Sequence, residues 1–417
     1  MKPFPPTALT RAQIDASFDA LASGDINWRG GRAPLYVFGG DSEAYEVGRD
    51  AFFRFFSENA LGARRAFGSV RQMEQDIVEM GLSLFNGHDG MAGIVTSGGS
   101  ESIFLAVRAA RAEARAKRGL ARGVGNMVMP DTAHPAFTKA AQSMDLDERR
   151  IPVLANGRAD VQAMAQAIDH DTVMLIGSAP CFPYGVIDPI DALGQVALEH
   201  QTWLHVDACV GGYLAPFARD LGYPMPHFDL GVPGVSSLSA DLHKYGFCPK
   251  PSSTVFFSTP ERAKLAGFDL DVWPSGRFVT STLVGTRPAG GVAGAWATIQ
   301  FLGVEGYRKV ALQVMQMRDA YVAGIKAIPG YRMVAEPDLA VMAFGDPDID
   351  MMRVAALMGE RGWLPGTISR PAGMHLMLSL LHDAARESYL SDLAACSRLA
   401  HQEAAAGIVE KRVSVTY

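Results

Sequence analysis

Cysteines, long apolar runs and an excess of basic residues are scarce or missing in this sequence. The four cysteines, Cys181, Cys209, Cys248 and Cys396, are widely spaced and form no CxxC pair, which argues against a disulfide framework and against a zinc site. The formal net charge of −6 gives no reason to expect nucleic acid as a partner. We therefore expect reduced thiols, a cytoplasmic location, no bound metal and no nucleic-acid partner.

A membrane-spanning segment and a targeting segment are not expected either. No apolar run approaches the roughly 18 residues that a membrane span needs. The opening sequence MKPFPPTALTRAQ has no apolar core typical of a signal peptide. Hydrophobic residues make up 48% and charged residues 20% of the 417 positions, which is an ordinary globular composition. This length suffices for one large domain and a smaller one.

Short apolar runs alternate with helical patterns through the middle of the chain. We predict buried strands at residues 91–97, 126–130, 172–179, 202–208, 235–241 and 253–258. We predict helices from Ser100 onward and at residues 44–59, 70–85, 135–143 and 190–200. This alternation implies an α/β fold, with a mostly parallel sheet that has helices on both faces.

Three parts are predicted along the chain. Residues 1–60 form an N-terminal arm, residues 61–309 a large domain, and residues 310–417 a small C-terminal α+β domain. One helix is expected within residues 285–301, after a Gly-rich turn, and a separate helix at residues 311–327. The C-terminal domain then continues with predicted strands near 333–345 and at 374–380, and with helices at 351–361 and 384–405.

The Gly98-Gly99 turn, between a predicted strand and a predicted helix, is the first candidate site. Backbone N–H groups at a helix N-terminus and the helix dipole favour an anion, and glycine lets a phosphate come close to the backbone. The segment 96–102 lacks the spacing of a Walker loop or of a dinucleotide-binding loop. A plain turn capped by Ser100 is the alternative interpretation.

Three further residues follow apolar segments and could share one site. Asp207 ends a predicted strand, where ligands bind beside open α/β sheets, although a helix cap or a surface loop would also explain it. Lys244 follows another strand, beside His243; a closed pocket would lower its pKa, as an imine-forming lysine requires, whereas most lysines are exposed. His134 is expected on the helix after residues 126–130, and a structural role is the alternative for it.

Together these residues supply the groups that pyridoxal phosphate (PLP) needs: an anion site, an aromatic ring, a carboxylate and an amine. The motifs that contain them are TSGGSES (96–102), HVDACVGG (205–212) and SADLHKYGFCPKPSS (239–253). These motifs resemble those of the sphingosine-1-phosphate lyases, which belong to the group II PLP-dependent decarboxylase family of fold type I. The resemblance continues through AHPAFTKAA (133–141) and MHLMLSLLH (374–382), and covers nearly the whole chain from about residue 33.

The resemblance implies three catalytic residues. Lys244 would form a Schiff base with PLP, Asp207 would pair with the pyridinium nitrogen, and His134 would stack on the ring face. Cofactor binding is implied for these three and also for Gly99, Ser100, Ser178, His243 and Thr286. Ser178 would lie near the ring substituents, whereas Thr286 would reach the cofactor phosphate from the partner subunit of a homodimer.

Substrate binding is implied for Tyr36, Tyr245 and Lys250. The sequence departs from the family in the arm, where the family pattern Asn-x-Leu-His reads NALG at residues 59–62. Gly62 thus stands where the family has a histidine, which indicates a different substrate preference.

The resemblance implies a lyase that acts on a small 2-amino-3-hydroxy substrate, with or without a phosphate, and releases an aldehyde and an amine. An amino-acid α-decarboxylase is the alternative, because it would use the same cofactor residues and differ in the substrate contacts that select the bond to be broken. A protein that only binds a partner is disfavoured, because Lys244, Asp207 and His134 are all present. The sequence leaves the choice between lyase and decarboxylase open.

Overall fold

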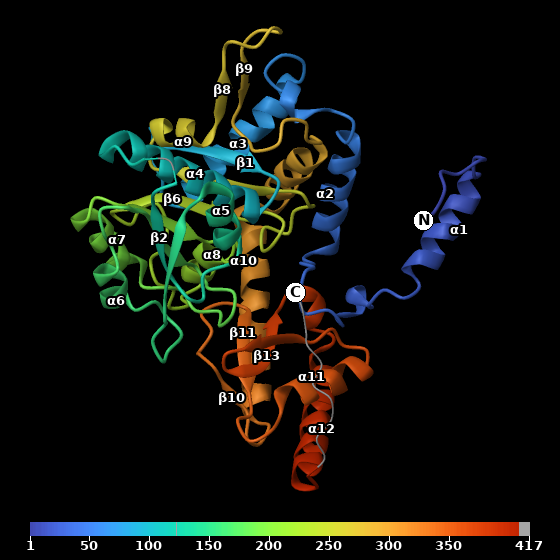
Figure 1. Cartoon of the computed structure of the whole chain (residues 1–417). Coiled ribbons are helices and arrows are strands. Elements are labelled where there is room, and N and C mark those ends of the chain that lie inside the picture. The colour runs from blue at the N-terminus through green and yellow to red at the C-terminus, as the bar shows by residue number, and fades with distance from the viewer. Residues whose placement is uncertain (122, 408–417) are drawn as a thin grey trace.

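A seven-stranded sheet forms the centre of the large domain (Figure 1). The computed structural model describes residues 1–121 and 123–407. The sheet order is β1-β7-β6-β5-β4-β2-β3, with bounds β1 (Ala92–Thr96), β2 (Asn126–Pro130), β3 (Asp147–Ile151), β4 (Thr172–Ser178), β5 (Trp203–Asp207), β6 (Val235–Ala240) and β7 (Ser253–Phe257). Neighbouring strands from β6 to β3 are parallel, whereas β7 is antiparallel to β1 and β6. The predicted, mostly parallel sheet is confirmed.

Helices cover both faces of this sheet, because successive strand residues point to opposite sides. In β4, Met174 and Ile176 share a core with residues of α4 (Gly99–Arg118), α5 (Ala136–Met144) and α9 (Pro260–Ala266). Leu175, between them, belongs to the core on the other face, together with residues of α3 (Gly68–Leu84), α6 (Val161–Gln166), α7 (Ile190–Glu199), α8 (Ala215–Asp220) and α10 (Gly290–Lys326). Strands buried on both faces are typical of a parallel sheet.

Helix α10 agrees with the prediction of two helices in this region. The sequence predicts them at residues 285–301 and 311–327, and α10 consists of two helical stretches that meet at a kink at Gly303, whose dihedral angles are not helical (φ 53°, ψ −172°). The bounds differ, because the first stretch begins only at Gly290. Glycine adopts a positive φ at little steric cost, so the helix bends there and continues. The predicted boundary between residues 309 and 310 falls inside α10, and the division of the chain into three parts stays a prediction.

A second, antiparallel sheet lies at the far end of α10 (Figure 1). Its order is β10-β11-β13-β12, with bounds β10 (Arg332–Met333), β11 (Val341–Gly345), β12 (Gly366–Ser369) and β13 (Ala372–Met377). Helices α11 (Met351–Glu360) and α12 (Arg386–Ala405) accompany this sheet. The C-terminal part of the chain therefore has the predicted α+β composition.

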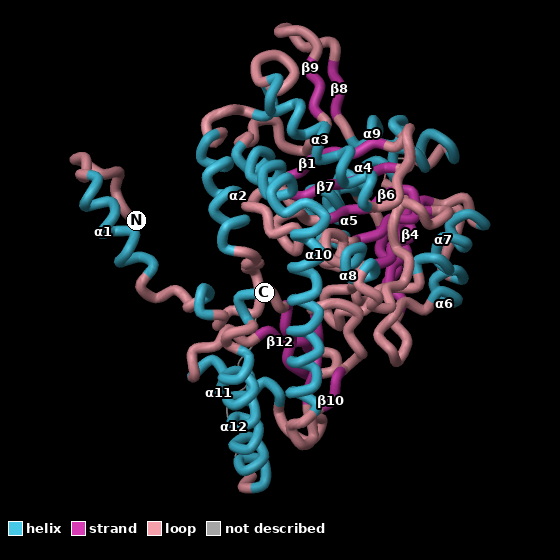
Figure 2. The backbone as a smooth tube through the Cα atoms, turned by 180° about the vertical axis from the view of Figure 1, so that it is seen from behind, coloured by secondary structure: helices cyan, strands magenta, loops and turns pink. Residues whose placement is uncertain are grey.

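The N-terminal arm holds two helices of different character. Helix α2 (Ser42–Arg54) packs closely on α10, where a Cβ on Gly48 would lie 2.6 Å from the Thr298 hydroxyl. Helix α1 (Arg11–Ala22), which the sequence analysis did not predict, has no buried residue and stands away from the rest of the chain in both overall views (Figures 1 and 2).

The hairpin of β8 (Phe268–Leu270) and β9 (Phe278–Thr280) projects from the opposite end of the molecule from α12 (Figure 1). Both strands are short, and an isolated two-stranded hairpin is only marginally stable in water. Within residues 1–121 and 123–407, no helix is long and apolar enough to cross a membrane.

Candidate active site

A cavity of about 740 Å³ opens where the carboxyl ends of β2 and β6 meet the small domain and the arm. Ligands bind at this edge of open α/β sheets. Three segments of the chain contribute to its wall. The N-terminal segment contributes Leu35, Tyr36 and Phe38. The segment that carries the seven-stranded sheet contributes Asp131, Thr132, His134, Pro135, Phe182, Pro183, Tyr184, His243, Lys244 and Lys250. The segment that carries the second sheet contributes Thr367, Ile368, Ser369, Arg370 and Met377. The predicted residues Tyr36, His134, His243, Lys244 and Lys250 thus share one cavity.

Lys244 forms an ion pair with a carboxylate that the sequence analysis did not single out. Its Nζ lies 2.9 Å from Oδ2 of Asp241, which follows β6 directly and is buried. The other carboxylate oxygen of Asp241 accepts a hydrogen bond from the Ser253 hydroxyl at 2.5 Å. Burial acts to lower the pKa of Lys244. The charge and hydrogen bond of Asp241, together with the influence of Cys209 and Asp207, outweigh burial, and the pKa is raised. The expected lowering of this pKa is therefore wrong for the arrangement in this structure, because the lysine has a buried counter-ion.

Asp207 is the last residue of β5 and is buried beneath the same edge of the sheet. Its Oδ1 accepts hydrogen bonds from the backbone N–H of Cys209 at 3.1 Å and from the Ser239 hydroxyl at 3.4 Å. Its negative charge also acts on the pKa values of both His134 and Lys244. A fixed carboxylate in this position suits a positively charged ring nitrogen.

His134 lies in the turn before α5, because α5 begins only at Ala136. The prediction that His134 lies on this helix is therefore wrong. Its Nδ1 accepts the backbone N–H of Ala136 at 3.1 Å, which fixes the ring orientation. Burial lowers the pKa of His134, although the charge of Asp207 opposes this effect. A neutral imidazole held in this way can present its face to a planar ring.

The Gly98-Gly99 turn lies against the same residues. A Cβ on Gly99 would lie 2.7 Å from Cys209 Sγ and 2.9 Å from Asp241 Oδ2, so only glycine fits at the start of α4. A Cβ on Gly98 would lie 3.5 Å from the ring of His243. Ser100 follows in the first turn of the helix and is exposed. This helix N-terminus, together with a histidine, offers donors to an anion.

These residues fit PLP on the chemistry of their donor groups. Lys244 offers an amine to an aldehyde, Asp207 a carboxylate to a ring nitrogen, His134 a ring face, and the start of α4 a phosphate cradle. Ser178 ends β4 beside Asp207 in the strand register and is buried. Its backbone N–H donates to Asp188 at 2.8 Å.

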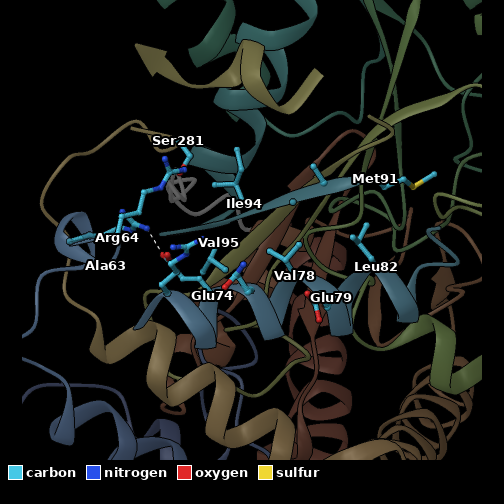
Figure 3. A pocket seen from close by; sticks show the side chains of 15 residues that line it. Ala63, Arg64, Glu74, Val78, Glu79, Leu82, Met91, Ile94, Val95 and Ser281 are labelled. Carbon is cyan, nitrogen blue, oxygen red and sulfur yellow. Dashed lines mark hydrogen bonds and ion pairs between the residues drawn. The ribbon is translucent and has the colours of Figure 1, made fainter. Parts of the chain in front are cut away.

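Thr286 does not lie in this cavity. Its exposed hydroxyl accepts a hydrogen bond from Asn59 Nδ2 at 3.2 Å. The next residue, Arg287, lines a different cavity, of about 720 Å³, beside α3 and β1 and pairs there with Glu74. Figure 3 shows Arg64 and Glu74 at one end of this second cavity, and Leu82 and Met91 at the other. Within one chain, Thr286 is therefore not brought together with Lys244.

The three predicted substrate residues divide into two groups. Tyr36 and Lys250 line the cavity, and Lys250 Nζ donates a hydrogen bond to the backbone oxygen of Tyr36 at 3.1 Å. Tyr245 is fully buried and does not line it; its hydroxyl donates to the carbonyl of Leu378 at 2.6 Å and lies 3.2 Å from that of Ala340. The position of Tyr245 suits a role in joining the large and small domains and not contact with a substrate.

The fold and the cavity together define a class of protein: a PLP-dependent enzyme of fold type I. The family profile described as "Pyridoxal-dependent decarboxylase conserved domain" matches residues 70–345. This match covers more than half of the chain, and the chain belongs to that family. Its cofactor is PLP, and it is a lyase.

Individual relatives agree with this assignment. The chain is 37% identical over 394 residues to a sphingosine-1-phosphate lyase of Oryza sativa subsp. japonica, an alignment that covers 93% of this chain and 73% of the relative. The solved structure of a sphingosine-1-phosphate lyase of Burkholderia pseudomallei superposes with a TM-score of 0.91 at 34% identity, covering 98% of this chain and 95% of that one. A probable L-tyrosine/L-aspartate decarboxylase of Methanothermobacter thermautotrophicus is 33% identical over 323 residues, covering 78% of this chain and 86% of the relative.

Proposed function

We propose that this chain breaks the bond between carbons 2 and 3 of a 2-amino-3-hydroxy substrate, with or without a phosphate, and releases an aldehyde and an amine. The observation that carries the proposal is the composition of the cavity wall. Lys250 and Arg370 provide positive charge near Lys244, and much of the remaining wall is apolar, with Leu35, Phe38, Pro135, Phe182, Ile368 and Met377. Such a wall suits an amine that carries both an apolar chain and an anionic group. The likeness to sphingosine-1-phosphate lyases supports the same reaction.

Each proposed site residue has a role that follows from its surroundings. When bound, PLP supplies an aldehyde that combines with amines and a ring that withdraws electrons from the neighbouring carbon. Asp207 would stabilise a proton on the ring nitrogen, and the neutral ring of His134 would offer its face to the cofactor ring. Gly99, Ser100 and His243 would hold the cofactor phosphate at the start of α4, and Ser178, beside Asp207 in the strand register, would lie near the ring substituents. Tyr36 and Lys250 contact the substrate from the arm side of the cavity.

Lys244 has a second role as a proton carrier. When the bond between carbons 2 and 3 breaks, the 3-hydroxyl passes its proton to the neutral amine of Lys244, carbon 3 becomes an aldehyde, and the electron pair stays on carbon 2. Carbon 2 then needs a proton to leave as the amine. Lys244 Nζ holds one beside Asp241, 2.9 Å away, and faces the cavity. We assign this protonation to Lys244.

An amino-acid α-decarboxylase is the competing function, supported by the identity to the archaeal decarboxylase. It would use the same cofactor residues and release carbon dioxide. Product analysis of the purified holoenzyme distinguishes the two functions. We expect an aldehyde from 2-amino-3-hydroxy substrates such as sphingosine phosphate or its short-chain analogues. Carbon dioxide from ordinary amino acids, with no aldehyde from any hydroxylated amine, would overturn the proposal.

We also propose that two copies form a homodimer with two composite active sites. Thr286 is exposed and lies outside its own chain's cavity, as expected of a residue that completes the cofactor site of a partner. Helix α1 supports the same assembly, because Ile14, Phe18 and Leu21 are 41%, 63% and 76% exposed on one face of a helix that stands away from its own chain (Figure 2). The four free, buried cysteines support a reducing, cytoplasmic location.

A further inference from the structure

The carboxylate of Asp131 stands out on the cavity wall. Asp131 follows β2 directly and is half-buried. Its Oδ1 is buried and has no hydrogen-bond partner among the described residues. Leaving a buried carboxylate oxygen without a partner is unfavourable. The other acidic groups at this edge of the sheet, Asp207 and Asp241, both accept hydrogen bonds within the fold.

The next residue, Thr132, repeats this pattern. Its side chain also lines the cavity and is buried, and its Oγ1 has no hydrogen-bond partner among the described residues. Buried hydroxyl groups are normally satisfied within the fold. Two adjacent side chains on one wall therefore leave hydrogen-bonding capacity unused, on the same turn that carries His134. A ligand in the cavity would be able to use that capacity.

The charge of the cavity indicates what the ligand group is. Three basic side chains, Lys244, Lys250 and Arg370, line the wall, whereas Asp131 is the single acidic residue among its described lining residues. A second ammonium group on the substrate would meet these three cations. A hydroxyl group is neutral, can donate to the Asp131 carboxylate, and can accept from the hydroxyl of Thr132. Hydrogen bonds to a charged acceptor are the stronger ones.

We propose that Asp131 and Thr132 form a subsite for a hydroxyl group on the chain of the amino substrate. This subsite selects hydroxylated amines over amines with a plain hydrocarbon chain. The proposal rests on the proposed function only in taking an amine as the substrate, and it holds for a lyase and for a decarboxylase alike. It adds a specificity determinant to the residues that bind the cofactor.

Equilibrium binding to the holoenzyme tests the subsite without requiring any bond to be broken. The probes are straight-chain primary amines of equal length: the parent alkylamine, a series with one hydroxyl at successive carbons, and the terminal diamine. Binding is followed by the change in absorbance of the bound cofactor. We expect the hydroxyl to tighten binding by at least about tenfold at one position of the chain. The diamine is expected to bind no more tightly than the parent amine.

Variants connect this preference to the two residues. Asp131→Ala should reduce the tenfold advantage of the preferred amino alcohol to less than about threefold, and Thr132→Val should reduce it in part. Ile368→Ala is the matched control, because it enlarges the same cavity without removing a polar group, so the advantage should be unchanged.

An advantage that survives Asp131→Ala, or no preferred hydroxyl position in the wild type, would overturn the subsite. Tighter binding of the diamine would overturn the assignment to a hydroxyl. Failure to release an aldehyde would refute only the lyase reaction, because these binding measurements do not depend on it.

Discussion

Lys244 Nζ and Asp241 Oδ2 lie 2.9 Å apart, and both groups are largely buried. This ion pair gives the lysine that we assign to the cofactor a counter-ion from the same turn of the chain. Asp207, the last residue of β5, and Cys209, two residues later, also act to raise the pKa of this lysine. The charge of the lysine in turn acts to lower the pKa of His134. His243 and Lys250 complete the set of ionisable groups around it. Of these, Asp241 makes the direct contact.

The first prediction concerns the pH dependence of cofactor capture. Only the neutral amine of Lys244 can attack the aldehyde of PLP, and Asp241 raises the pKa of this amine. Asp241→Asn leaves burial as the main influence and should lower that pKa, so more neutral amine is present at neutral pH. We expect the apoenzyme variant to capture PLP at least about tenfold faster at pH 7, with a rate profile displaced to lower pH by about one unit or more.

Stopped-flow absorbance across a pH series measures this rate. In the wild type the rate should rise about tenfold per pH unit between pH 7 and 9, since the neutral fraction does so below the pKa. This wild-type measurement needs no variant, so it tests the raised pKa of Lys244 even if the Asp241→Asn protein does not fold. A wild-type plateau below pH 8, or identical profiles for the two proteins, would contradict the ion-pair account.

A second prediction concerns Asp207. Asp207→Asn preserves the shape and the acceptor Oδ1 that binds the Cys209 N–H, but it removes the charge beside the ring nitrogen. We expect kcat to fall by at least about 100-fold with cofactor still bound. Ser239→Ala is the matched control, because it deletes one weak hydrogen bond to Asp207 and leaves the charge, and should cost less than about tenfold. Steady-state kinetics, with cofactor content measured in parallel, gives the loss of kcat in both variants. A loss in Ser239→Ala at least as large as that in Asp207→Asn would show that Asp207 has only a structural role.

The third prediction uses the two glycines at the start of α4. A Cβ on Gly99 would collide with Cys209 Sγ and Asp241 Oδ2, whereas a Cβ on Gly98 would meet its nearest neighbour at an ordinary distance of 3.5 Å. Gly99→Ala should therefore weaken PLP binding by at least about tenfold, and Gly98→Ala by less than about threefold. Equilibrium dialysis of PLP against each apoenzyme gives both affinities. Equal losses in the two variants would show that the close approach at Gly99 does not shape the cofactor site.

A fourth prediction tests the composite active site. Lys244→Ala and Thr286→Glu should each be inactive alone, because the first removes the cofactor amine and the second sets a negative charge against the cofactor phosphate of the partner. After mixing and reassembly, half of the dimers contain one chain of each kind and one intact site, so about a quarter of wild-type activity should return. Sedimentation of the wild type should give a dimer. A fully active Thr286→Glu protein, or a mixture that stays inactive, would contradict shared sites.

The elements that the sequence predicted well are those whose burial is uniform. Residues 172–179 form β4 almost as predicted, because a strand covered on both faces is a continuous apolar run. Strand β3 was missed, since its sequence DERRI carries four charged side chains at the edge of the sheet. Helix α1 was missed as well, although Thr10 and Gln13 form a capping box that could have signalled its start.

The candidate site was predicted only in part, and the reason is the direction of individual side chains. The motif around Lys244 located the cavity, but it did not show that Asp241 turns toward the lysine while Tyr245 turns away into the core. Asp131 and Thr132 carry no motif of their own, and their importance comes from the hydrogen bonds that the fold does not give them. Contacts between segments far apart in sequence, such as Thr286 with Asn59, are equally invisible to local patterns.

The most direct test of the account is to locate the covalent bond between the protein and PLP. Borohydride reduction of the holoenzyme makes the carbon–nitrogen bond permanent, and mass spectrometry of the digested protein then identifies the modified lysine. We predict a single phosphopyridoxyl label on Lys244, and no label in Lys244→Ala treated in the same way. A label on Lys250 or any other lysine, or a wild-type protein that takes up no label, would contradict the assignment of Lys244.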